Sequence, residues 1–258
     1  MSRALWLALA LLAGCATQAP EGPTTNTGAI VGEASTPRNR ARIHTELATL
    51  YYTRGSMSVA LEELRIAVAA DPTYAAAHGV FGLVYMELRE NDLARQNFQR
   101  ALGYAPDDPD INHNFGWFLC QTGKEHEAAP YFLRALGNPL YATPARSFAA
   151  AGTCALRVGK LAEAEDQLQR ALRVDPNQPA ALLQSAHLRY RQGRFAEARP
   201  LVAQYVQVSA ATAESLWLAL RIERRLGARA AELSYANQLR RRFPGSPEFQ
   251  SLQRGAYE

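Results

Sequence analysis

Residues 75–108 read AAAHGVFGLVYMELRENDLARQNFQRALGYAPDD, and the outline of this stretch recurs along most of the chain. Its Ala94 belongs to a series in steps of 34, 34, 36 and 34 residues: Ala60, Ala94, Ala128, Ala164 and Ala198. A second alanine follows seven residues later in four units, at Ala67, Ala101, Ala135 and Ala171. A proline closes several units, at Pro72, Pro106, Pro176 and Pro244. A period of this length predicts an array of helical hairpins.

Each unit also carries one small and one bulky residue at fixed positions. The small residues are Ala48, Gly82, Gly116, Gly152 and Ala186. The bulky residues are Leu64, Phe98, Phe132, Leu168 and Val202. A side chain larger than methyl at the small position would push the two helices of a hairpin apart, so the pattern indicates interdigitated packing. It resembles the tetratricopeptide repeat and predicts an all-α fold, a right-handed superhelical solenoid of six helical hairpins.

The predicted units are 41–74, 75–108, 109–142, 145–178, 179–212 and 213–246. Thr143 and Pro144 are two extra residues, expected in a turn where an insertion costs little. The sixth unit departs most, with Leu220 in the small position and Glu232 where alanine is expected. Terminal repeats usually deviate because one face meets water. Residues 247–258 are predicted to form a C-terminal tail.

The N-terminus has the features of a bacterial lipoprotein signal. Arg3 precedes an apolar run over residues 4–12 that is too short to span a bilayer, and the sequence LAGC occupies residues 12–15. Residues 1–14 are therefore predicted to be removed, leaving Cys15 lipid-modified. An ordinary secretory signal with a chance cysteine is the alternative. Residues 15–40 are predicted to be the lipidated cysteine and a flexible tether, with a span of about 25–30 Å. The uncharged Ala16 is typical of lipoproteins sent to the outer membrane.

Charge and cysteine content restrict the partners and the compartment. The formal charge of +4 is a mild excess, and nucleic acid is not an expected partner outside the cytoplasm. Apart from Cys15, the chain has Cys120 and Cys154, which are assigned to the first helices of neighbouring units. Such helices pack about 8–10 Å apart, so a disulfide can form if the two side chains converge. Two small buried thiols remain the alternative.

The array offers a binding surface rather than a catalytic centre. Curvature makes a concave groove from the first helices, and the tetratricopeptide register places there Tyr52, Leu83, Met86, His113, Trp117, Leu156, Tyr190 and Trp217, with Arg157, His187, Arg221 and Arg224. Large aromatic and methionine side chains are enriched at binding surfaces, so the set favours a peptide groove. Packing of each side chain against a neighbouring helix is the alternative.

Motifs that would carry chemistry are missing from the sequence. It has no Gly-rich phosphate loop, no HExxH and no GxSxG, and the cluster at residues 125–127 is typical of solvated charge. Neither an enzyme, a cofactor, a metal site nor a small-molecule substrate is predicted. Several arginines crowd the last unit; a solvated end cap is one interpretation, and an acidic partner or anionic lipid surface is the other.

Several motifs carry a narrower resemblance. These are NHNFGWFLC at residues 112–120, PLY at 139–141, NQP at 177–179 and RRFPGSP at 241–247. With the signal and the six units, they resemble the PilF/PilW family of type IV pilus biogenesis lipoproteins. The resemblance implies an outer-membrane lipoprotein that faces the periplasm and acts as a pilotin or stability factor for the secretin PilQ. It also implies a bond between Cys120 and Cys154, because some relatives carry a matching pair.

A general periplasmic adaptor lipoprotein, serving a protease or the outer-membrane assembly machinery, would share the signal and the array. It is the alternative function. An enzyme would need a further domain, and only residues 247–258 follow the last predicted unit.

Overall fold

The computed structural model describes residues 36–257, which form helices and connecting turns without any strand. The helices of this part are α2 (Pro37–Thr53), α3 (Met57–Ala70), α4 (Ala75–Glu87), α5 (Asn91–Tyr104), α6 (Pro109–Gln121), α7 (Glu125–Leu136), α8 (Pro144–Arg157), α9 (Leu161–Val174), α10 (Pro179–Arg191), α11 (Phe195–Val208), α12 (Ala213–Arg225), α13 (Arg229–Arg242) and α14 (Pro247–Arg254). The predicted all-α fold is confirmed.

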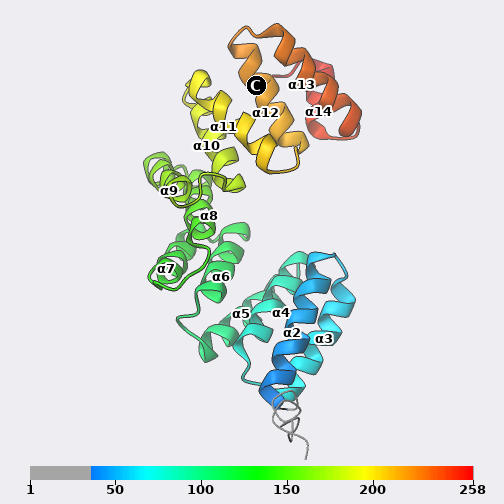
Figure 1. Ribbon diagram of the computed structural model, residues 1–258, viewed down its shortest axis with the longest axis vertical. Helices are drawn as coiled ribbons and strands as arrows, with labels where there is room; N and C mark the ends of the chain where they lie inside the picture. The colour runs from blue at the N-terminus through cyan, green and yellow to red at the C-terminus, as the bar shows by residue number, and fades with distance from the viewer. Residues whose placement is uncertain (1–35, 258) are drawn as a thin grey trace, which may run out of the picture.

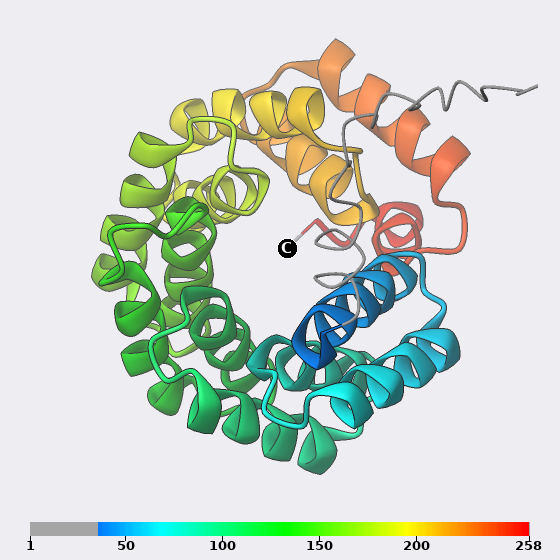
Figure 2. The ribbon, with the colours of Figure 1, turned by 60° about the horizontal axis from the view of Figure 1, so that its bottom comes forward.

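Consecutive helices pair into six hairpins that stack into a curved array (Figure 1). The first helix of each hairpin also packs against the first helix of the next, whereas the second helices of successive hairpins do not approach one another within residues 36–257. Figure 2 accordingly shows the first helices as an inner ring and the second helices as an outer ring. The chain turns clockwise there as it recedes from the viewer, which is the right-handed sense predicted for the solenoid.

The small and bulky positions meet inside the hairpins. A Cβ atom built on Gly82 would lie 2.7 Å from the ring of Phe98, and one on Gly152 would lie 2.7 Å from Cγ of Leu168. Phe98 and Leu168 are fully or almost fully buried. Since real Cβ atoms do not approach other atoms so closely, alanine at either position would force the bulky partner to shift.

A residue in the left-handed conformation ends the first helix in each of the six hairpins. It is glycine in five of them, at Gly55, Gly123, Gly159, Gly193 and Gly227, with φ between 73° and 78°. The second hairpin has Arg89 there, at φ 62°. Side chains other than glycine are disfavoured in this region, so this hairpin accepts a local backbone cost that its neighbours avoid.

Three predicted boundaries differ from the structure. Helix α2 begins at Pro37, inside the segment 15–40 that was predicted as a tether, because Thr36 caps it by accepting a hydrogen bond from the Asn39 backbone amide. Pro144, predicted to lie in a turn, is the first residue of α8; proline suits this position because the amide there has no helical partner. Residues 1–35, including Cys15 and the signal, lie outside the described residues.

The third difference is at the C-terminus, where the predicted tail contains α14. The Ser246 side chain caps this helix by accepting from the Phe249 amide, and Pro247 occupies its first turn. Phe249, Leu252 and Tyr257 pack against the cluster formed by the last hairpin, which buries Leu216, Trp217, Leu220 and Leu239. Helix α14 therefore covers the apolar end of the solenoid, as terminal elements of such arrays must do.

The sixth hairpin reverses the usual order of sizes. Leu220 of α12 stands where the other units have alanine or glycine, and it is fully buried. Its counterpart sixteen residues later is Ala236 of α13, where the other units have Leu, Phe or Val. Ala236 packs against the cluster that contains Leu220. The combined volume at the contact is therefore kept, with the large side chain supplied by the opposite helix.

Candidate protein-binding groove

The first helices of the third to sixth hairpins line a row of three adjoining hollows, which together make up the groove. One hollow of about 200 Å³ lies between α6, α8 and the start of α10, and it includes Trp117 and Thr153. A second, of about 480 Å³, lies between α8, α10 and α12, and includes Thr153, Leu156 and Arg191. A third, of about 470 Å³, involves α10, α12 and the segment after α14, and also includes Arg191. Neighbouring hollows share a lining residue, Thr153 or Arg191, so the three hollows adjoin one another.

Trp117, Leu156 and Tyr190 are predicted groove residues that line these hollows. Each is half-buried and packs partly against the core, Trp117 on the cluster of the third hairpin and Tyr190 on that of the fifth. The aromatic rings are therefore held by their own hairpins and present one face to the groove. Rigid, half-exposed aromatic side chains contribute large contact areas at low entropic cost.

The predicted residues of the first two hairpins are placed differently. Tyr52, Leu83 and Met86 are half-buried and pack against the clusters of their own and adjoining hairpins, and none of the three hollows described above includes them. Burial, together with the nearby charge of Glu87, raises the pKa of Tyr52, so its hydroxyl stays protonated near neutral pH.

His113, a predicted groove residue, lines the first hollow, but it is only 6% exposed. Its Nδ1 lies 2.9 Å from Oγ of Ser147, and that hydroxyl donates to the hydroxyl of Tyr141 at 3.1 Å. Burial, and to a lesser degree the positive charge of Arg146, lowers the pKa of His113 to about 3. The ring is thus a neutral link between the third and fourth hairpins.

Trp217 is also placed differently from the prediction. It is 8% exposed because the ring of Tyr257 stacks on it, with the ring centroids 5.6 Å apart. The position predicted to bind a partner is instead occupied by the chain's own C-terminal segment, which Figure 2 shows running into the interior of the ring. Residues 247–258 are predicted only as a tail, so Tyr257 is not among the predicted groove residues.

The middle hollow has a charged wall. The Nε2 atom of His187 lies 2.9 Å from a carboxylate oxygen of Glu214, joining α10 to α12. The close approach of His187 lowers the pKa of Glu214, which remains ionised at neutral pH. Arg157, at the end of α8, lies 3.2 Å from Glu125 and donates to Gln121 of α6. Polar pairs of this kind fix the relative positions of the helices that form the groove.

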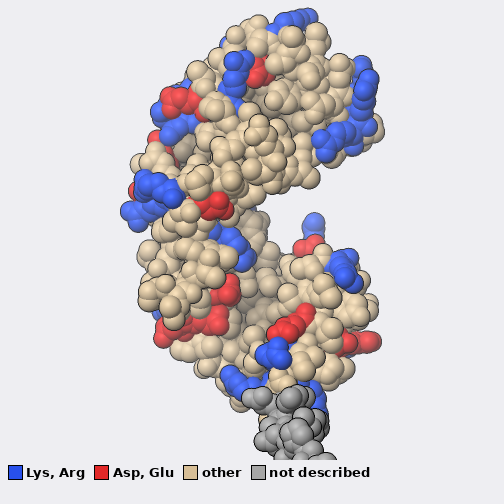
Figure 3. Space-filling model, in the orientation of Figure 1, with Lys and Arg blue, Asp and Glu red and all other residues tan. Residues whose placement is uncertain are grey.

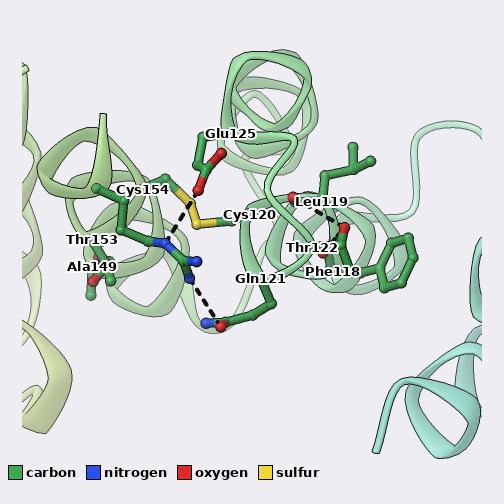
Figure 4. The surroundings of a disulfide bond; sticks show 10 residues. Phe118, Leu119, Cys120, Gln121, Thr122, Glu125, Ala149, Thr153 and Cys154 are labelled. Atoms are coloured by element: carbon green, nitrogen blue, oxygen red, sulfur yellow. Dashed lines mark hydrogen bonds and ion pairs between the residues drawn. A yellow bond between two sulfur atoms is a disulfide. The ribbon is translucent and has the colours of Figure 1, made fainter. Parts of the chain in front are cut away.

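Cys120 of α6 and Cys154 of α8 are joined in the structure, with their Cα atoms 5.7 Å apart. Figure 4 shows the bond between the two helices, close to Gln121 and Glu125. Both residues are buried. The bond connects the third and fourth hairpins across the two-residue insertion, which is where the repeat spacing changes.

No group of three or more His, Cys, Asp or Glu side chains within residues 36–257 is placed to hold a metal ion. None of the helices in this range is long and apolar enough to cross a membrane.

The surface has the outline of a hook, hollowed between its N-terminal and C-terminal halves (Figure 3). The features that the residues do provide, a curved groove with aromatic and charged walls, are those of a protein that binds other proteins.

These features define a tetratricopeptide repeat protein, and residues 80–144 and 155–221 each match the tetratricopeptide repeat family. The chain is 31% identical to the type IV pilus assembly protein PilF of Pseudomonas aeruginosa over 243 residues, covering 94% of this chain and 93% of that protein. It belongs to the PilF/PilW family of type IV pilus biogenesis proteins, which confirms the resemblance seen in the sequence.

Solved structures agree with this assignment. The crystal structure of PilW, described as a widely conserved type IV pilus biogenesis factor, matches with a TM-score of 0.74 at 32% identity, covering 83% of this chain and 98% of that one. The structure of Pseudomonas aeruginosa PilF matches with a TM-score of 0.76 at 30% identity, covering 85% and 99%. An uncharacterised protein of Haemophilus influenzae is 26% identical over 135 residues, 52% of this chain and 75% of that protein.

Proposed function

We propose that the protein is a lipid-anchored adaptor, or pilotin, on the periplasmic face of the outer membrane. It binds a segment of the secretin PilQ in its groove and promotes the localisation and multimerisation of the secretin, and thereby pilus stability. The observation that carries the proposal is the groove of adjoining hollows from α6 to α12 in a chain that is similar to PilF along almost its whole length.

The lipid at Cys15 has a mechanistic role in this proposal. It sets the membrane address, and the segment between Cys15 and α2 gives the array reach. Confinement next to the membrane raises the effective concentration of a captured secretin subunit, so weak groove contacts suffice for delivery. Replacing Cys15 with Ser should leave the array folded but remove it from the outer-membrane fraction, with loss of secretin multimers and of surface pili. Multimers and pili at normal levels in that strain would contradict the role of the anchor.

Site-specific photo-crosslinking in intact cells tests the occupant of the groove. A photoreactive residue at position 156 replaces Leu156, which lines the middle hollow. The matched control replaces Leu133, which is 66% exposed on α7 in the outer ring. We expect crosslinks to PilQ from position 156 and not from position 133. Crosslinks from position 156 to a protease or to the outer-membrane assembly machinery would instead identify a general periplasmic adaptor.

A further inference from the structure

The hollow at the C-terminal end of the groove is lined by arginine and aromatic side chains. Its residues are Tyr190 and Arg191 of α10, Phe195 of α11, Arg221, Arg224 and Arg225 of α12, and Gly255 and Tyr257 after α14. No acidic residue is among them. We propose that this arginine pocket binds a short acidic segment of a partner protein, with its carboxylates on the guanidinium groups and an adjoining apolar side chain against the rings.

The charge of the pocket is largely uncompensated by the protein. Arg224 pairs with Glu232 at 2.9 Å, but within residues 36–257 no ion pair involves Arg191, Arg221 or Arg225. The nearest acidic residue in the sequence, Glu223, is buried and pairs with Arg199 of α11. Three guanidinium groups thus remain to receive carboxylates, which they bind by paired, charge-assisted hydrogen bonds.

Aromatic rings hold the arginines in place before any ligand arrives. The guanidinium carbon of Arg221 lies 4.8 Å from the ring centroid of Tyr190, and that of Arg225 lies 5.2 Å from the centroid of Phe195. That of Arg224 lies 3.8 Å from the centroid of Tyr257. Stacking uses the face of a guanidinium group and leaves N–H groups at its edge for hydrogen bonding. A site whose side chains are already ordered loses less entropy on binding.

Arg221 also shows that the protein does not satisfy the pocket by itself. Its Nε atom is buried and has no hydrogen-bond partner among the described residues. A buried donor without a partner is unfavourable, and most such groups in folded proteins are paired. Stacking on the aromatic rings, and not a hydrogen bond of this nitrogen within the fold, therefore fixes the position of the Arg221 side chain.

The position of the pocket favours a polypeptide over a lipid surface. It lies where α10 and α12 end, next to the start of α11 and the segment after α14. Figure 2 shows that C-terminal segment running into the interior of the ring. A bilayer surface is flat and does not follow a concave wall, whereas an extended chain does. The pocket also adjoins the middle hollow through Arg191, so a chain lying along the groove reaches it directly. The inference does not rest on the identity of the partner in the proposed function.

Selection from a random octapeptide library displayed on phage, with the purified protein as bait, tests the inference. We expect the retained peptides to be enriched in Asp and Glu over the unselected library. The enrichment should be lost with the variant Arg221→Gln/Arg225→Gln. For an enriched peptide measured by fluorescence anisotropy, each arginine removed should weaken binding about tenfold, the equivalent of about 1.4 kcal/mol.

A matched control carries the same charge change outside the pocket, as Arg229→Gln/Arg241→Gln on α13, where both arginines are exposed. This variant should retain the same peptides as the unmodified protein. If loss of the Arg221 stacking unfolds the test variant, Arg191→Gln/Arg225→Gln replaces it, since both of these arginines are exposed. Retained peptides with no excess of Asp and Glu, or equal losses in the test and control variants, would overturn the inference.

Vesicle flotation separates a lipid site from a peptide site. The unlipidated Cys15→Ser protein is mixed with vesicles of phosphatidylcholine with and without phosphatidylglycerol. Binding to the anionic vesicles that depends on Arg221 and Arg225, without selection of acidic peptides, would replace the proposed peptide site with a lipid headgroup site.

Discussion

Replacing Gly82 or Gly103 of the second hairpin with alanine adds one methyl group. The two replacements should change the free energy of unfolding in opposite directions. Gly82 lies in α4 and Gly103 in α5, so alanine improves the intrinsic helix propensity at both. A Cβ atom on Gly103 would have nothing within 4 Å, and the residue is exposed. Gly103→Ala should therefore raise the free energy of unfolding by about 0.5–1 kcal/mol.

The surroundings of Gly82 reverse the sign. The added Cβ atom would lie 2.7, 2.7 and 2.8 Å from Cδ1, Cε1 and Cγ of Phe98, whereas ordinary contacts begin at 3.4 Å. The Phe98 ring is fully buried, and its centroid lies 5.6 Å from those of Phe115 and Phe118, so it has no free space to move into. Overpacking of this kind costs about 1–3 kcal/mol, which exceeds the gain in propensity. Gly82→Ala should lower the free energy of unfolding by about 1–2 kcal/mol.

Urea unfolding of both variants and of the unmodified protein, with the disulfide intact, measures the difference. Far-UV circular dichroism and tryptophan fluorescence should both be followed, because the units of a solenoid can unfold separately. Gly116→Ala adds an intermediate case, since its Cβ atom would approach Phe132 to only 3.0 Å. If Gly82→Ala proved as stable as Gly103→Ala, the interdigitation of the hairpins would not be the constraint described here.

Three further predictions concern contacts between helices. The unfolded, unreduced protein should show no reactive thiol from Cys120 or Cys154, and two reactive thiols would exclude the bond. Because the bond joins residues 34 apart, replacing both with Ser should lower the free energy of unfolding by about 3–4 kcal/mol. Because the folded pKa of His113 is about 3, below its ordinary value of 6.5, only the unfolded state binds the proton between these values. The free energy of unfolding should therefore fall by about 2 kcal/mol from pH 7 to pH 5 because of His113. Urea titrations at both pH values should show that the variant His113→Asn lacks this loss. If the variant and the unmodified protein had the same pH dependence, His113 would not be buried in its neutral form. Leu220→Ala should lower the free energy of unfolding by about 2–5 kcal/mol, and the added change Ala236→Leu should restore part of that stability, as measured by thermal unfolding. If the effects of the two substitutions were purely additive, the reversed packing would be excluded.

The array itself was predictable because its constraints are local and repeated. Each unit must bury the same contact, so small residues such as Gly82 and bulky ones such as Phe98 recur with the period, and that period implies helical hairpins. Chance similarity in one unit would carry little weight, but agreement across units predicts the fold class. The glycine that ends most first helices, as at Gly123, was a further signal of the same kind.

The individual groove residues were less predictable, because exposure depends on contacts between units. The register places His113 on the inner ring, but its burial results from Ser147 of the next hairpin and from Tyr141, and their approach depends on the local curvature. Trp217 has the register of a groove residue and is covered by Tyr257, forty residues later. Contacts that occur in only one unit leave no periodic signal in a single sequence.

The wrong prediction for the C-terminal segment also affected the predicted binding surface. Ser246 followed by Pro247 is a helix start signal, so α14 could be recognised from the sequence, although residues 247–258 were predicted only as a tail. In the structure α14 covers the apolar end of the last hairpin, including Leu216 and Leu220, and the residues after it bring Tyr257 onto Trp217 and Arg224. The same segment therefore closes the hydrophobic core and forms one wall of the arginine pocket. The end cap that the fold requires and the binding site that we propose are thus built from one segment, and a truncation after residue 246 would remove both together.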